Sequence, residues 1–240
     1  MTYGELVYFV IDTLKVISDD SHWQEEHILK QLDNYRSMLL KQRYSDVRKD
    51  IPDSNYQTIC IDLTEVPAIK GMPCEGRDYL MSIKQVPTPL TIIEPKITSI
   101  DFFQGNFQYV NIDRFRFVGH NKWLKNQIYA TIAPDKHLYL RSNNPQLYYL
   151  RGVRMTGIFE DTIKTFDLQC PDTGKVCDIM DAEFPLEEGL MTTLIELVVK
   201  SLAGTLYQPA DKQNNAADDL SKIQDYIARN LKERREQRVI

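Results

Sequence analysis

Apolar residues recur at spacings of three and four positions near the start of the chain. This pattern predicts two helices, one over residues 3–17 and a second after Trp23. Their apolar faces are made by Leu6, Val10, Leu14 and Ile17 in the first helix and by Ile28, Leu32, Tyr35 and Leu39 in the second. Thr2 and Glu5 have the spacing of a capping box at the start of the first helix. Because few residues separate the helices, we expect an antiparallel hairpin whose apolar faces need a further partner.

The pattern changes beyond Asp50, where prolines become frequent and the segments between them are rich in β-branched and aromatic residues. Such segments favour strands over helices. The predicted strands are Tyr56 to Leu63, Tyr79 to Lys84, Tyr109 to Phe117, Gln127 to Ile132, His137 to Arg141 and Val153 to Phe159. Turn residues at 133–136 predict one hairpin, and the Pro-Asp-Thr-Gly sequence within residues 167–180 predicts another.

Helical spacing returns in two segments near the end of the chain, residues 186–207 and about 218–235. The simplest way to cover the first helical pair is to pack it against this last pair. The sequence therefore predicts an α+β fold, with terminal helices forming a helical bundle and a large β-rich insertion in the middle. The expected division is a helical hairpin at 1–50, a β-rich domain at 51–184, and closing helices with a docking tail at 185–240.

Composition narrows the class of protein. With 240 residues and 42% hydrophobic content, the chain is long and apolar enough for a folded core. Its formal net charge of -5 argues against a surface shaped as a whole to neutralise nucleic acid. No apolar run is long enough to predict a membrane-spanning helix, and the amino terminus lacks the pattern of a signal peptide, so we expect a protein that stays in the cytoplasm after synthesis. The four cysteines are too few and scattered for a disulfide framework, and we expect them to be reduced.

Recognisable catalytic motifs are absent from the sequence, which has no glycine-rich phosphate loop, no HExxH and no nucleophile elbow. We therefore expect no enzymatic activity and no cofactor. His22 and His27 are five residues apart, which on a helix places them on different faces and disfavours a shared metal. Cys170 and Cys177 flank a turn but lack two further zinc ligands, so small buried or half-buried residues are the favoured interpretation over zinc or a disulfide.

Aromatic and basic residues alternate in the segment 107–123. Interleaved rings and cations can stack bases and hold phosphates, which would suit single-stranded nucleic acid. An amphipathic strand explains the same pattern, because neighbouring residues of a strand point to opposite faces. We favour the strand, since the whole chain is acidic.

The last twelve residues have a different charge from the rest of the chain. Residues 229–240 contain five basic and two acidic side chains, a local charge of +3 that leaves -8 on the remainder. Such a segment can be a solvated helix end, or a docking element that enters an acidic groove of a partner protein. The candidate docking residues are Arg229, Leu231, Lys232, Arg234, Arg235, Arg238, Val239 and Ile240.

Three segments carry a family resemblance: EEHILKQLDNYRSMLLKQRYSD at 25–46, DIPDSNYQTICIDL at 50–63 and LIELVVKSLAGTLYQPADKQNNAADDL at 194–220. In these segments and in the order of its elements, the chain resembles the head-to-tail connector, or adaptor, ring proteins of crAss-like short-tailed bacteriophages. The resemblance implies a structural virion protein that forms a ring, twelve-fold as is usual in the family. Such a ring lies under the portal and continues the DNA channel toward the tail.

The resemblance also implies the partners, namely further copies of the chain, the portal protein, other tail or neck ring proteins, and genomic DNA that passes through the lumen without sequence-specific binding. No membrane partner is expected. The location would be the neck or tail of the virion, reached by assembly in the host cytoplasm, and Leu231 to Ile240 would reach into the portal or the next ring. The alternatives are another tail or baseplate structural protein, a nucleic-acid-binding packaging accessory factor, and an enzyme with an unrecognised site.

Overall fold

The computed structural model describes residues 1–17, 23–46, 49–66, 79–100, 105–119, 123–124, 126–171 and 176–205. The chain divides at Lys200 into two units, and the described part of the second unit is the end of one helix. The first unit, residues 1–200, contains the rest of the described chain.

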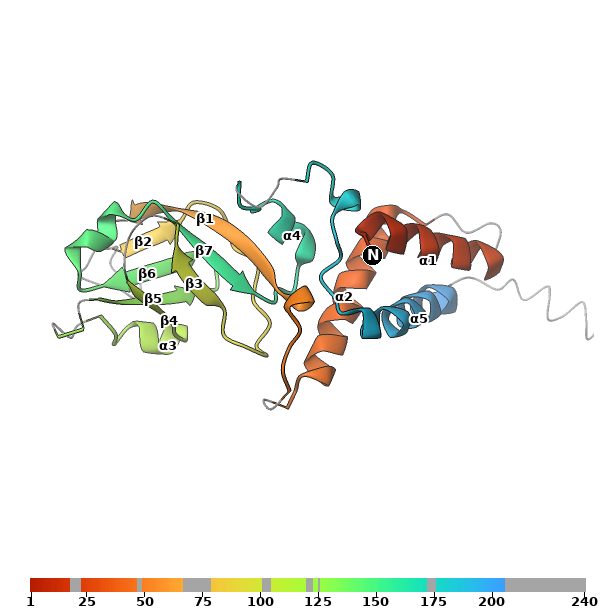
Figure 1. Ribbon diagram of the computed structural model, residues 1–240, viewed down its shortest axis with the longest axis horizontal. Helices are drawn as coiled ribbons and strands as arrows, with labels where there is room; N and C mark the ends of the chain where they lie inside the picture. Colours follow the sequence, from red (N-terminus) through yellow and green to blue (C-terminus); the bar gives the residue numbers. More distant parts are fainter. Residues whose placement is uncertain are drawn as a thin grey trace, which may run out of the picture. The chain divides into compact units, whose positions relative to one another are not determined.

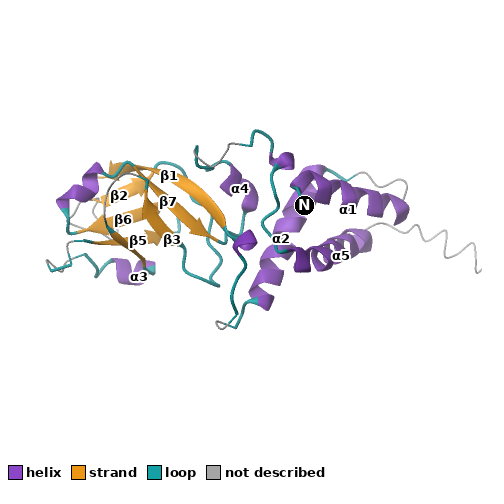
Figure 2. Cartoon of the chain, in the orientation of Figure 1, coloured by secondary structure: helices purple, strands orange, loops and turns teal. Residues whose placement is uncertain are grey.

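A seven-stranded sheet dominates the first unit (Figures 1 and 2). Its strands are β1 (Gln57–Val66), β2 (Tyr79–Ser82), β3 (Lys96–Ser99), β4 (Asn106–Tyr109), β5 (Gln127–Ile132), β6 (Leu138–Ser142) and β7 (Gly152–Gly157). The order across the sheet is β3-β7-β1-β2-β6-β5-β4, and the pairs are antiparallel except for β4 with β5. The edge strands β3 and β4 contact each other without pairing, so the sheet curls into a nearly closed, barrel-like form.

The core of this sheet follows from alternation along the strands. In β1, Ile59, Ile61 and Leu63 are buried while Asp62 and Thr64 are exposed, as expected for a strand with one face in a core. Buried residues of the facing strands complete the cluster, among them Leu80, Ile128, Ala130, Leu138, Leu140, Val153 and Met155. The predicted hairpin between β5 and β6 is confirmed by their antiparallel pairing.

The described residues also form three longer helices, α1 (Tyr3–Ile17), α2 (Glu25–Arg43) and α5 (Glu188–Thr205). The predicted capping box of α1 is confirmed, because the Thr2 N–H donates to Glu5 Oε2 at 2.9 Å and the Glu5 N–H donates to Thr2 Oγ1 at 3.2 Å. Short helices α3 (Ile112–Phe115) and α4 (Thr162–Phe166) and the 3-10 turns η1 (Asp53–Asn55), η2 (Pro145–Tyr149) and η3 (Ile179–Asp181) lie in the connections.

The predicted fold class, a terminal helical bundle with a β-rich insertion, is wrong, because the curled sheet is the main body of the structure. Much of the cover for α1 comes from the extended chain around η3. The Tyr3 N–H donates to Ala182 O at 3.0 Å, the Phe184 N–H donates to Met1 O at 3.0 Å, and the rings of Tyr3 and Phe184 meet edge to face. Apolar spacing shows that a helix face must be covered, but it does not show what covers it. The helix predicted at 218–235 lies outside the described residues.

Two local predictions are also wrong. A strand was predicted at Tyr109 to Phe117, but the observed strand β4 spans Asn106–Tyr109 and ends where the predicted one begins. Helix α3 follows because the Asn111 side chain accepts a hydrogen bond from the Asp113 N–H and caps a helix there. In the described part of the hairpin predicted at 167–180, Gln169 makes an isolated bridge to Ile59 and residues 179–181 form η3.

Candidate functional site

In the described part of the chain, no group of three or more His, Cys, Asp or Glu side chains is placed to hold a metal ion. No helix among the same residues is long and apolar enough to cross a membrane. The ring of His27 stacks on Trp23 with centroids 5.6 Å apart, while His22 lies outside the described residues. All eight candidate docking residues, Arg229, Leu231, Lys232, Arg234, Arg235, Arg238, Val239 and Ile240, also lie outside them, so the docking tail stays a prediction.

The aromatic and basic segment 107–123 is divided between two environments. Phe115 is buried against the sheet, and Phe107 is half-buried. Arg114, Arg116 and Phe117 are exposed at the end of α3. The segment is therefore not one alternating strand, but it does expose two cations and an aromatic ring close together in sequence at the end of α3.

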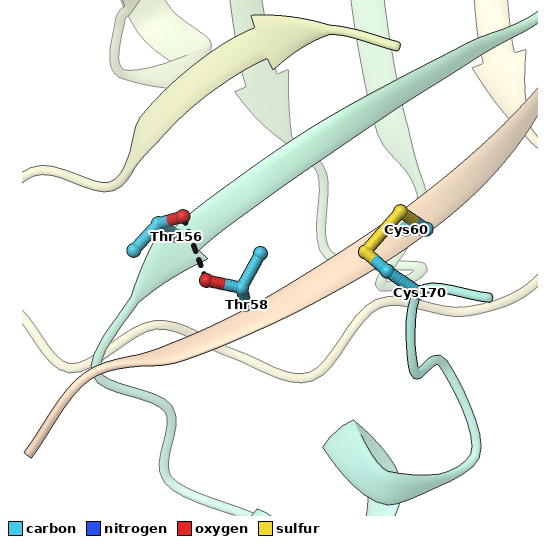
Figure 3. Close-up of a disulfide and its surroundings, with 4 residues drawn as sticks. All are labelled: Thr58, Cys60, Thr156 and Cys170. Carbon is cyan, nitrogen blue, oxygen red and sulfur yellow. Dashed lines mark hydrogen bonds between the residues drawn. A yellow bond between two sulfur atoms is a disulfide. The ribbon is translucent and has the colours of Figure 1, made fainter. Parts of the chain in front are cut away.

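A disulfide joins Cys60 in the middle of β1 to Cys170, and Figure 3 shows the two side chains. The segment after α4 runs along β1 at this point, since the Cys60 N–H donates to Leu168 O at 2.8 Å. On the other side of β1, the hydroxyls of Thr58 and Thr156 are hydrogen-bonded at 3.0 Å across the β1–β7 pair (Figure 3).

The predicted reduced state is thus wrong for Cys60 and Cys170, and the sequence carried no signal for a pair 110 residues apart. Cys170 is buried, as the favoured interpretation expected, but its partner is Cys60. Cys177 is free and exposed, and Cys74 lies outside the described residues.

Arg36 on α2 is fully buried and joins three other segments. Its guanidinium donates to Pro185 O at 2.7 Å, to Phe159 O at 2.8 Å and to Asn55 O at 3.3 Å. Burial lowers the pKa of Arg36 to about 10, which the nearby Asp33 opposes, so the side chain is charged at neutral pH. The planar fork of arginine suits this role because it can donate in several directions at once. Arg36 therefore attaches α2 to η1, to the chain after β7 and to the segment before α5.

Asp33 lies one turn before Arg36 and holds the start of α4. Its carboxylate accepts hydrogen bonds from the Thr162 N–H at 3.0 Å and from the Thr162 hydroxyl. Burial raises the pKa of Asp33 to about 6, although the bonds from Thr162 and the charge of Arg36 oppose this shift. No sequence motif predicted that Asp33 and Arg36 would be buried and hydrogen-bonded. The only sequence signal for this role is that the two charged residues lie on a helix face that is otherwise apolar.

We expect the contribution of Asp33 to stability to fall as pH rises from about 4 to about 6. The folded pKa is above the ordinary value of 3.8, so the folded state binds the proton more tightly than the unfolded state in this window. The test compares free energies of unfolding of the wild type and Asp33→Asn in urea at several pH values. The advantage of the wild type should shrink between pH 4 and 6 and stay constant above pH 7. An advantage that grows with pH would show that Thr162 and Arg36 outweigh burial.

Comparison with known proteins gives two concordant findings. A family model described as Phage tail ring protein 2 matches residues 5–220. The curated protein named Ring protein 2, from Bacteroides phage crAss001, is 52% identical over 221 residues. The matched region covers 92% of this chain and 98% of that relative. The chain therefore belongs to the phage tail ring protein 2 family and is a ring virion protein of the crAss-like phages.

Proposed function

We propose that this ring protein sits at the head-to-tail junction, where it bridges the portal and the tail and continues the DNA channel. The observation that carries the proposal is the 52% identity to a ring protein along 92% of the chain. The ring would contain twelve copies, contact the portal and other tail or neck ring proteins, and have no catalytic role. Subunits would assemble in the host cytoplasm and remain in the virion.

The charge of the chain is consistent with a channel wall. Its net charge is -5, and DNA carries one negative charge per phosphate. Repulsion between like charges keeps a moving duplex from adhering to the wall of a lumen. Genomic DNA would therefore pass through the ring without sequence-specific binding.

The docking tail is the proposed contact with the portal. Residues 229–240 have a charge of +3 and end in Val239 and Ile240, so charge can guide the encounter while apolar side chains provide buried area. A short charged segment of this kind binds best in an acidic groove.

Truncation after Asn230 tests the tail and the ring together. We expect the full-length protein to co-sediment with purified portal as a complex of ring size, and we expect residues 1–230 to lose that complex while keeping the same melting temperature. A matched charge control replaces the exposed Lys30 and Lys200 with glutamine, which lowers the net charge by two, as the truncation does, and should retain portal binding.

The outcomes separate the alternatives. Truncated protein that still binds the portal would show that the tail is not the docking element. Full-length protein that stays monomeric, ignores the portal and retards DNA in a gel would overturn the connector proposal. That result would favour a nucleic-acid-binding packaging factor, for which the exposed Arg114, Arg116 and Phe117 are the supporting observation.

A further inference from the structure

Helix α1 has a second apolar stripe on the side opposite its core stripe. Tyr8, Phe9 and Val16 are 61%, 53% and 89% exposed, and they are flanked by exposed Glu5 and Asp12. The spacing of these five residues places them on one face of the helix. We call this set the α1 outer face. Adjacent large apolar side chains left in water on a single helix face are typical of a protein–protein contact.

A second exposed surface lies at the end of α3 and consists of Arg114, Arg116 and Phe117, with Phe117 80% exposed. We call it the α3 end. Hydrogen bonds from a buried side chain hold its backbone in place: the Arg141 guanidinium donates to Phe115 O and to Arg116 O, both at 3.5 Å. The chain then turns at Gly119, whose φ of +80° is costly for residues with a side chain. Phe117 is therefore presented on a supported turn.

The two surfaces differ in charge. The α1 outer face has Glu5 and Asp12, with Lys15 at its margin, and is acidic on balance. The α3 end has Arg114 and Arg116, with Asp113 beside them, and is basic on balance. Each surface therefore has an exposed aromatic side chain, and the charged residues beside it are acidic on the α1 outer face and basic at the α3 end.

The surfaces also belong to separate parts of the first unit. Helix α1 packs against α2 and the η3 segment, whereas α3 packs against β5 near the edge of the sheet. A closed ring of identical copies needs a contact in which one surface meets a different surface of the next copy. Two α1 outer faces would bring Glu5 and Asp12 against their own copies, which like charge disfavours.

We infer that the α1 outer face of one copy docks against the α3 end of the next copy in the ring. This inference rests on the ring role of the family and identifies where neighbouring subunits meet. A buried aromatic side chain contributes about 150–250 Å² of contact. A stable interface buries roughly 800 Å² on each partner. Tyr8 and Phe9 supply part of this area on one copy and Phe117 supplies part of it on the next, and further residues complete it.

Cysteine cross-linking between two differently labelled proteins tests the contact. In a chain where Cys74 and Cys177 are replaced by serine, one protein carries Phe9→Cys and the other carries Phe117→Cys. We expect a short bis-maleimide to link the mixture into covalent dimers at least tenfold more than either protein alone. A chain with both substitutions should give a ladder of linked oligomers. Tyr149→Cys, an equally exposed aromatic position on η2, is the matched control and should not link to Phe9→Cys.

Charge exchange provides an independent measurement. Asp12→Arg should reduce the ring fraction in sedimentation velocity at least tenfold, and adding Arg116→Asp to the same chain should restore it. The inferred contact would be overturned if the cysteine variants form rings but give no cross-link between positions 9 and 117. It would also be overturned if Phe9→Cys links mainly to another Phe9→Cys, to a site within its own chain or to the portal. Either result would leave the ring role intact. Wild-type protein that never forms rings, with or without the portal, would overturn both.

Discussion

Replacing Arg36 with methionine is expected to lower the free energy of unfolding by about 3–5 kcal/mol, the cost typical of removing one member of a buried charged pair, here the pair with Asp33. The side chain is fully buried and donates to the carbonyls of Asn55, Phe159 and Pro185. Without it, three buried acceptors lose their donor, and each unsatisfied group costs about 1–3 kcal/mol. Urea denaturation followed by circular dichroism measures the change.

Two further variants show whether hydrogen bonding at this position is the cause. Arg36→Lys keeps a charge but cannot reach three carbonyls that lie in different directions, so its loss should fall between those of the wild type and Arg36→Met. Lys41→Met on the same helix removes a half-exposed ion pair with Glu160 at 3.0 Å and should cost less than about 1 kcal/mol. If Arg36→Met costs no more than Lys41→Met, Arg36 does not join α2 to the neighbouring segments as described.

Reduction of the Cys60–Cys170 bond is expected to have an effect of similar size. The bond closes a loop of 110 residues, and constraining the unfolded chain over a loop of this length stabilises a protein by about 4–5 kcal/mol in the entropic model. We therefore expect a strong reductant to lower the urea midpoint of the wild type and to raise its slope with denaturant, because the unfolded chain without the cross-link exposes more surface. Thermal unfolding with and without the reductant gives a second measurement.

A variant that lacks both cysteines of the disulfide separates the effect of the bond from other effects of the reductant. Cys60→Ala with Cys170→Ala should unfold near the reduced wild type and should not respond to reductant. Cys177→Ser, which changes an exposed free thiol, should retain the full response. An unchanged midpoint for reduced wild type would mean that β1 and the chain after α4 are held by packing alone.

Local elements were predicted well where a single period or cap governs them. Helix α1 has the predicted limits and capping box, and β5 has the predicted limits of Gln127 to Ile132. These features depend on residues close in sequence, whose spacing and hydrogen-bonding groups are visible in the chain itself. The strand expected at Tyr109 to Phe117 was wrong because Asn111 caps α3 inside a segment that alternates like a strand.

The sequence by itself determined helices α1 and α2, strand β5, the face of α1 that is buried and, through its resemblance, the family. Only the tertiary structure decided the sheet order, the parallel pairing of β4 with β5, the Cys60–Cys170 bond and the position of Arg36 among three carbonyls. It also decided that the sheet, rather than a helical bundle, is the main body. Apolar periodicity states that a face is buried, whereas the identity of its cover depends on contacts between residues that can be more than a hundred positions apart.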